Sequence, residues 1–147
     1  MVKFQNVTKI YPRNSYGSIS KVVLDGVSFE VNNKEFVSLV GRSGAGKTTL
    51  FKLLLAEEQP TKGRIFFDNQ DVCKIKRNNL FQLRRRIGTV FQDYKLLPLK
   101  TVFENIAYVM EVIGKSDEEI QRDALEVLKI VGLADKSLSE AKERVSS

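Results

Sequence analysis

The sequence has no histidine, and Cys73 is the single cysteine among its 147 residues. Without histidine, no imidazole can serve as a general base, a metal ligand or a phosphate sensor. One cysteine excludes an internal disulfide bond and is compatible with a reducing compartment. No apolar run approaches the roughly 20 residues that a membrane-spanning helix needs, and the N-terminal stretch MVKFQNVTKIYP lacks the apolar core of a signal peptide.

The composition permits one small globular domain, because 42% of the residues are hydrophobic. The 24 basic and 18 acidic residues leave a formal charge of +6. This excess suits nucleic acid or an anionic membrane surface, and by itself it selects neither. A nucleic-acid site would gather basic and aromatic residues on one face, whereas the lysines are scattered along the chain. We therefore expect no specific nucleic-acid partner.

The stretch GRSGAGKT, residues 41–48, fits the phosphate-binding pattern G-x-x-x-x-G-K-[ST] at every fixed position. Glycines let successive N–H groups point into one concavity, and the helix that follows adds its positive N-terminal end. Lys47 is expected to reach the terminal phosphates, and Thr48 to offer its hydroxyl to Mg²⁺. The residues expected to bind nucleotide in this loop are Gly41, Arg42, Ser43, Gly44, Ala45, Gly46, Lys47, Thr48 and Thr49.

The flanks of this loop support a phosphate site. Residues 36–40, FVSLV, form a short apolar run of the kind found in a buried parallel strand. After Lys47, leucines at positions 50, 53 and 54 have the spacing of one helical face. A strand, a glycine-rich loop and a helix are therefore expected in that order.

The rest of the chain predicts strands around this unit and helices after it. Strands are expected at residues 2–10, 21–31, 63–67 and 87–91, turns at 32–34 and 68–69, and a short helix that closes at residues 84–86. Two later helices begin with capping boxes, TVFE at 101–104 and SDEE at 116–119, and end at Gly114 and Gly132. The order predicts an α/β P-loop fold with an antiparallel element in front and a helical block behind.

Three stretches, SGAGKTTLFKLL, LRRRIGTVFQDYKLLP and TVFENIAYVMEVIG, resemble the ATP-binding subunit of ABC transporters. The resemblance covers roughly Val2 to Lys136 and is nearest to the bacterial cell-division branch, FtsE, which works with the membrane protein FtsX. Macrolide-export and lipoprotein-release ATPases share much of it. It implies a domain plan for 1–147, the N-terminal portion of one ABC ATP-binding domain. The plan has an antiparallel β element at 1–35, part of the P-loop core at 36–92, a helical block at 93–136 and an atypical tail at 137–147.

The resemblance also implies roles for residues outside the loop. Tyr11 matches the aromatic residue that stacks on adenine, and Gln92 matches the glutamine that contacts Mg²⁺ and the attacking water and senses the γ-phosphate. Residues 93–99 and the helix opening at Thr101 match the surface that contacts the membrane subunit. Alternatively, the leucines at 96, 97 and 99 pack inside the domain. The implied cofactors are ATP and Mg²⁺. The implied partners are an FtsX-like integral membrane subunit and a second copy in an ATP-sandwich dimer, on the cytoplasmic face of the plasma membrane.

Several parts of the family pattern are not found in these residues. The pattern continues with Leu-Ser-Gly-Gly, a strand ending in Asp with the catalytic Glu, and a switch histidine. Residues 138–141 read LSEA, so glutamate and alanine stand where two glycines would let a backbone approach phosphate. We expect a chain that binds ATP without the groups that hydrolyse it. We also expect residues 36–40 to be partly unpaired and exposed, because the strand carrying the acidic residues is their neighbour in such folds.

The sequence is therefore compatible with three hypotheses. The first is the ATP-binding part of an FtsE-like or related ABC exporter or lipoprotein-release complex. The second is a nucleotide-binding fragment that does not hydrolyse ATP. The third is a basic nucleic-acid-binding module.

Overall fold

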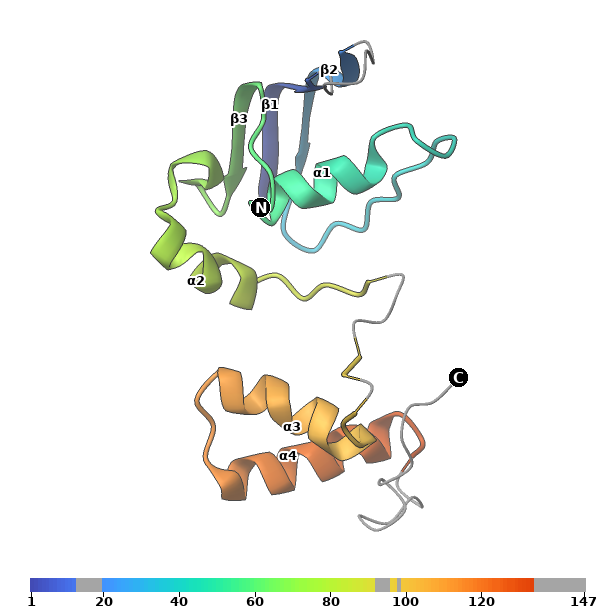
Figure 1. Cartoon of the computed structure of the whole chain (residues 1–147), viewed down its shortest axis with the longest axis vertical. Helices are drawn as coiled ribbons and strands as arrows, with labels where there is room; N and C mark the ends of the chain where they lie inside the picture. The colour runs from blue at the N-terminus through green and yellow to red at the C-terminus, as the bar shows by residue number, and fades with distance from the viewer. Residues whose placement is uncertain (13–19, 92–95, 98, 134–147) are drawn as a thin grey trace. The chain divides into compact units, whose positions relative to one another are not determined.

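The computed structural model describes residues 1–12, 20–91, 96–97 and 99–133, which fall into two compact units, Met1–Gly88 and Thr89–Ser147. The first unit contains a four-stranded sheet with a helix against one of its faces, and the second contains a pair of helices (Figure 1). The four-part division expected from the sequence stays a prediction.

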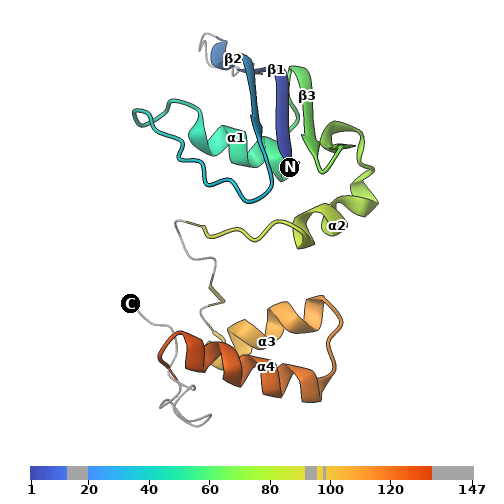
Figure 2. The same ribbon diagram turned by 180° about the vertical axis from the view of Figure 1, so that it is seen from behind.

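The sheet is antiparallel throughout, in the order β2-β1-β3-β4. Its strands are β1 (Val2–Tyr11), β2 (Lys21–Val31), β3 (Lys62–Phe67) and β4 (Gln70–Asp71). Figure 2 shows β1 between β2 and β3. The strands predicted at 2–10, 21–31 and 63–67 are confirmed. Asp68 and Asn69 both have positive φ, 45° and 64°, which is the geometry of a two-residue hairpin turn.

A bulge in β1 determines which side chains reach the core. Phe4 and Val7 are both buried, although simple alternation would point residues three apart to opposite faces. The register shifts between them, and Asn6 takes a φ of 47°. Ser28 stabilises the bulge, because its hydroxyl accepts a hydrogen bond from the Asn6 N–H at 2.8 Å. The backbone of the bulge at Gln5 and Asn6 lies so close to Gly63 that a Cβ at position 63 would clash with it, and Gly63 has a φ of 89°.

Helix α1 (Lys47–Leu54) packs on the sheet, as Figures 1 and 2 show. Leu53 is 1% exposed and belongs to the same buried cluster as Phe4, Val7 and Ile65. Downstream of β4 the chain forms the 3₁₀ turns Val72–Lys74 and Arg77–Asn79 and helix α2 (Leu80–Arg85), which adds the buried Leu83 to that cluster. The short helix expected to close at 84–86 is confirmed.

The strands predicted at residues 36–40 and 87–91 are wrong for this structure, since neither segment joins the sheet. Most of their apolar side chains are exposed, and Phe36 is 94%, Val40 93% and Val90 96% accessible. Ile87 is the exception that packs against the core of the first unit. A parallel strand must pair with a neighbour brought from elsewhere in the chain, and the described sheet of β1 to β4 includes neither segment. The expectation that 36–40 would be left unpaired and exposed is confirmed.

An ion-pair cluster joins the end of α1 to β1. The Glu58 carboxylate lies 3.0 Å from the Lys9 ammonium and 3.4 Å from that of Lys52. Burial raises the pKa of Glu58, but hydrogen bonds from Lys9 and Tyr11 and the charge of Lys9 lower it further. The pKa therefore lies below its ordinary value of 4.5.

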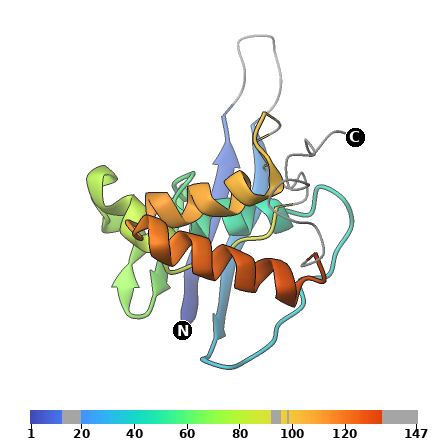
Figure 3. The same cartoon turned by 90° about the horizontal axis from the view of Figure 1, so that it is seen from below.

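The second unit is a helical hairpin of α3 (Val102–Val112) and α4 (Asp117–Ile130), which run side by side (Figure 3). Both predicted capping boxes are confirmed: Thr101 with Glu104, and Ser116 with Glu119. Each helix ends at a glycine with positive φ, as expected. The buried residues between the helices are Ala107, Ile120, Ala124 and Leu128.

We predict that Gly63→Ala strongly destabilises the first unit. An alanine Cβ would lie 2.4 Å from the carbonyl oxygen of Asn6. Left-handed strain costs about 1–3 kcal/mol and the clash adds to it, so we expect a loss of about 3 kcal/mol or more. Gly26→Ala is the matched control, because its φ is 58° but nothing lies within 4 Å of the added Cβ. It should cost about 1–2 kcal/mol. Equal losses in urea denaturation would contradict the bulge packing.

We predict that Glu58 makes stability depend on acid pH. Because its pKa is lower in the folded state, the unfolded chain binds more protons around pH 4. The stabilisation is present above the ordinary pKa of 4.5 and is lost as pH falls through the folded pKa. The difference in unfolding free energy between wild type and Glu58→Gln should therefore shrink as pH falls below about 4.5. Glu57→Gln, at an exposed neighbouring position, is the charge-matched control. A difference that stays constant from pH 7 to pH 3 would refute the role of this carboxylate.

Candidate functional site

The glycine-rich loop at residues 41–46 turns sharply before α1 begins. The Ala45 N–H donates to the carbonyl of Arg42 at 3.1 Å, which closes the turn. Gly44 and Gly46 have φ of 77° and 91°, in the left-handed region that a side chain disfavours. The glycines of the sequence pattern therefore stand where the backbone needs them.

Lys47 holds its charge against this loop. Its ammonium donates to the carbonyl oxygens of Gly41 at 2.7 Å and Arg42 at 2.9 Å. The side chain folds back over the backbone that precedes its own helix, which fixes the cation beside the loop. A cation in this place attracts a phosphate group.

The loop also offers backbone donors. Within the part of the chain that the structure describes, no hydrogen bond uses the N–H groups of Gly44, Gly46, Lys47 or Thr48. The first N–H groups of any helix lack intrahelical partners, and the helix dipole is positive there. Free donors, a positive helix end and a fixed ammonium make a site that suits the phosphates of a nucleotide.

Close packing brings this loop to the same end of the sheet as Tyr11. A Cβ on Gly46 would lie 2.9 Å from Leu24 and 3.1 Å from the carbonyl oxygen of Val23, so the loop touches β2 there. Leu24 pairs with Lys9 on β1, two residues before Tyr11. The phosphate loop therefore packs on β2 beside the Leu24–Lys9 pair, and Tyr11 follows Lys9 by two residues on β1.

The remaining predicted residues differ in how the structure places them. Thr48 is exposed, so its hydroxyl is accessible, whereas Thr49 is only 8% exposed and faces inward. Gln92, predicted to contact Mg²⁺ and water, lies outside the described residues, as do Asp93 and Pro98. Neither the nucleotide roles nor the metal roles of these residues are tested by the structure.

The segment after Gln92 displays leucines. Leu96, Leu97 and Leu99 are 44%, 36% and 83% exposed. Asn105 fixes the backbone of Leu97, because its side chain accepts from the Leu97 N–H at 2.8 Å and donates to the Leu97 carbonyl at 3.2 Å. Among the described residues these three leucines are therefore exposed to different degrees, and Leu99 most of all.

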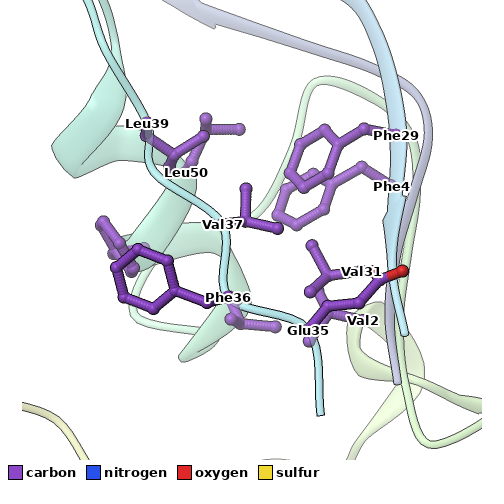
Figure 4. Close-up of a pocket in the computed structure, with 11 residues that line it drawn as sticks. Val2, Phe4, Phe29, Val31, Glu35, Phe36, Val37, Leu39 and Leu50 are labelled. Carbon is purple, nitrogen blue, oxygen red and sulfur yellow. The ribbon is translucent and has the colours of Figure 1, made fainter. Parts of the chain in front are cut away.

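An apolar cavity of about 370 Å³ lies between the sheet and the exposed segment at 36–40. Figure 4 shows the stacked rings of Phe4 and Phe29 on the sheet side, opposite Leu50 of α1, with Val37 between. The ring centroids are 4.6 Å apart. The lining is almost wholly apolar, so this cavity has no groups with which to bind phosphate.

Sequence reasoning missed Lys9 and Glu58, which contact Tyr11. The Lys9 ammonium lies over the Tyr11 ring, 5.0 Å from its centroid. Lys9 precedes Tyr11 by two positions on a strand, and that spacing puts both side chains on one face. This was the available signal, although nothing local identifies Glu58. Among the described helices, none is long and apolar enough to cross a membrane.

Comparison with known proteins shows the family of this chain. The ABC transporter family profile matches residues 24–147. The chain is 44% identical over 137 residues to the cell division ATP-binding protein FtsE of Bacillus subtilis, covering 93% of this chain and 58% of that protein. It is 38% identical over 137 residues to FtsE of Escherichia coli, covering 93% and 59%. The chain thus spans somewhat more than half the length of these curated relatives.

A solved structure gives the same result for the fold. The dimeric post-hydrolysis ATP-binding cassette MJ0796, bound to ADP and Pi, matches with a TM-score of 0.84 at 33% identity, over 99% of this chain and 63% of that one. A second dimeric structure of MJ0796, a bacterial ABC transporter cassette, matches with a TM-score of 0.79 at 34% identity, over 90% and 57%. The predicted fold class, an ABC-type P-loop fold with an antiparallel element, is confirmed. The chain belongs to the ABC transporter ATP-binding family, and its FtsE relatives are cell-division ATP-binding proteins.

Proposed function

We propose that this chain binds Mg²⁺–ATP through Gly41–Thr49, as the nucleotide-binding part of an FtsE-like ATP-binding subunit. The geometry of the phosphate loop carries the proposal. Lys47 is held against the loop, Gly44 and Gly46 take left-handed conformations, and the N–H groups at the start of α1 have no acceptor among the described residues. The triphosphate would bind these donors, and the base would stack on Tyr11.

The magnesium ion belongs to the same proposal. Thr48 is exposed at the helix start and offers a hydroxyl oxygen, a ligand type that Mg²⁺ accepts. Gln92 is the second proposed ligand and the proposed sensor of water and γ-phosphate. Bound with ATP, the ion would neutralise charge on the terminal phosphates.

We also propose the setting in which this subunit acts. The relatives named cell division ATP-binding protein suggest a role in bacterial division. The proposed partner there is an FtsX-like integral membrane subunit. The two MJ0796 structures are dimeric, which suggests a nucleotide-sandwich homodimer here as well. We place the protein on the cytoplasmic face of the plasma membrane, docked through residues 93–99 and the start of α3. The alternative settings are a related ABC export or lipoprotein-release complex, or nucleotide binding without hydrolysis.

Lys47→Ala should weaken the binding of Mg²⁺–ATP. The substitution removes a charge-assisted contact worth about 1.5–3 kcal/mol, so we expect the Kd to rise roughly ten- to a hundredfold in isothermal titration calorimetry. Lys74→Ala removes the same charge at an exposed position on a 3₁₀ turn and is the matched control. Equal affinities for the wild type and Lys47→Ala would sink the proposed nucleotide site.

Leu97→Asp should weaken docking to the membrane subunit. A carboxylate placed in an apolar contact is costly unless it is paired, so recovery of a co-expressed FtsX-like subunit should fall at least severalfold. Leu125→Asp is the matched control, because Leu125 is similarly exposed, at 40%, but lies on α4. Docking through leucines should persist at moderate salt, whereas attraction by net charge alone would fade. Unchanged recovery with Leu97→Asp would show that this docking surface is wrong.

A further inference from the structure

The ammonium of Lys9 connects three groups beside the proposed adenine position. It donates to the carbonyl of Gln59 at 2.8 Å and lies 3.0 Å from the Glu58 carboxylate. It also lies over the Tyr11 ring, 5.0 Å from the centroid. The Lys9 side chain is only 13% exposed, so these contacts are largely shielded from solvent. An enclosed cation with three partners is a poor candidate for a solubilising surface charge.

Glu58, the acidic partner in this cluster, is attached to α1. The N–H groups of Glu57 and Glu58 donate to the Lys52 carbonyl in the last turn of the helix, at 2.8 Å and 3.3 Å. The Lys52 ammonium lies 3.4 Å from the Glu58 carboxylate. Glu58 is therefore attached to the C-terminal end of α1, and the phosphate loop precedes the N-terminal end of the same helix.

The strand side of the cluster is equally well fixed. Thr61 donates its N–H to the carbonyl of Thr8 at 2.8 Å, and its hydroxyl accepts from the Ile10 N–H at 2.9 Å. These bonds join the segment after α1 to the end of β1. Lys9 adds a third link between β1 and this segment, through Glu58 and Gln59, on the face of β1 that also carries Tyr11.

We propose that Lys9 is a positioning residue for recognition of the adenine base. It holds the Tyr11 ring at a fixed place relative to α1 and the phosphate loop, through Glu58 and Gln59. The ammonium lies over one face of the ring, and in this proposal the base stacks on the other face. Lys9 thus determines how much more tightly ATP binds than the triphosphate group alone. This inference rests on the proposed function, since it needs a nucleotide at this loop.

The test compares ATP with inorganic tripolyphosphate by isothermal titration calorimetry, each with Mg²⁺, on the full 147-residue chain. In Lys9→Met, the Kd for ATP should rise about 2- to 12-fold, the range that one aromatic contact is worth. The Kd for tripolyphosphate should stay within about twofold. Lys9→Arg should return ATP affinity to within about twofold of the wild type, because a guanidinium also pairs with a carboxylate and stacks on a ring.

Two further variants separate positioning from general damage to the fold. Lys3→Met removes another ion-paired lysine from β1, the partner of Glu30, and should leave both affinities unchanged. Tyr11→Leu should reproduce the selective loss of ATP affinity. The double variant Lys9→Met/Tyr11→Leu should then lose no more than Tyr11→Leu alone, because Lys9 acts through the ring.

The outcomes against the inference are distinct. If Lys9→Met weakens both ligands equally, or neither, or if its effect adds fully to that of Tyr11→Leu, Lys9 does not position the base. If the wild type binds neither ATP nor tripolyphosphate, the proposed function itself is overturned, and this inference with it.

Discussion

The packing of α1 against the antiparallel sheet is the contact on which the proposed site depends. Leu53 is buried in the same cluster as Phe4 and Ile65, so the helix and the two central strands share one core. That core places the start of α1, and the loop before it, against β2. Gly46 has room only because it lacks a side chain, since a Cβ there would meet Leu24 at 2.9 Å. The position of the loop therefore depends on the burial of apolar residues of α1 in the core, and its close contact with β2 depends on glycine at position 46.

Polar contacts then refine what burial has placed. Lys47 is bonded to carbonyls of its own loop, and Lys9 to the segment that follows α1. Both lysines bond to backbone carbonyls of the fold, close to the groups that the proposed nucleotide would contact. The formal charge of +6 for the whole chain does not indicate a function. The positions of these two ammonium groups are more informative, because they are the basis of the proposed nucleotide site.

The two apolar segments at 36–40 and 87–91 show what a strand requires beyond its own composition. Their side chains are those of buried parallel strands, yet Phe36 and Val90 are among the most exposed residues described. Hydrophobic character favours burial, but strand pairing needs a neighbour to supply hydrogen bonds. Exposed apolar segments of this kind are prone to pair with other chains.

The sequence alone determined the features that depend on local chemistry. Capping residues define the starts of α3 and α4, glycines their ends, and Asp68-Asn69 the tight hairpin. The pattern from Gly41 to Thr48 likewise predicted the turn before α1, because the left-handed φ of Gly44 and Gly46 and the bonds of Lys47 to Gly41 and Arg42 lie within that short stretch. The tertiary structure decided which expected strands joined a sheet, since pairing is non-local. It also decided that Lys9 and Glu58 meet at Tyr11. Those residues come from segments about 50 positions apart, and they meet within 3.0 Å because α1 packs on the sheet and Thr61 bonds the segment after α1 to β1.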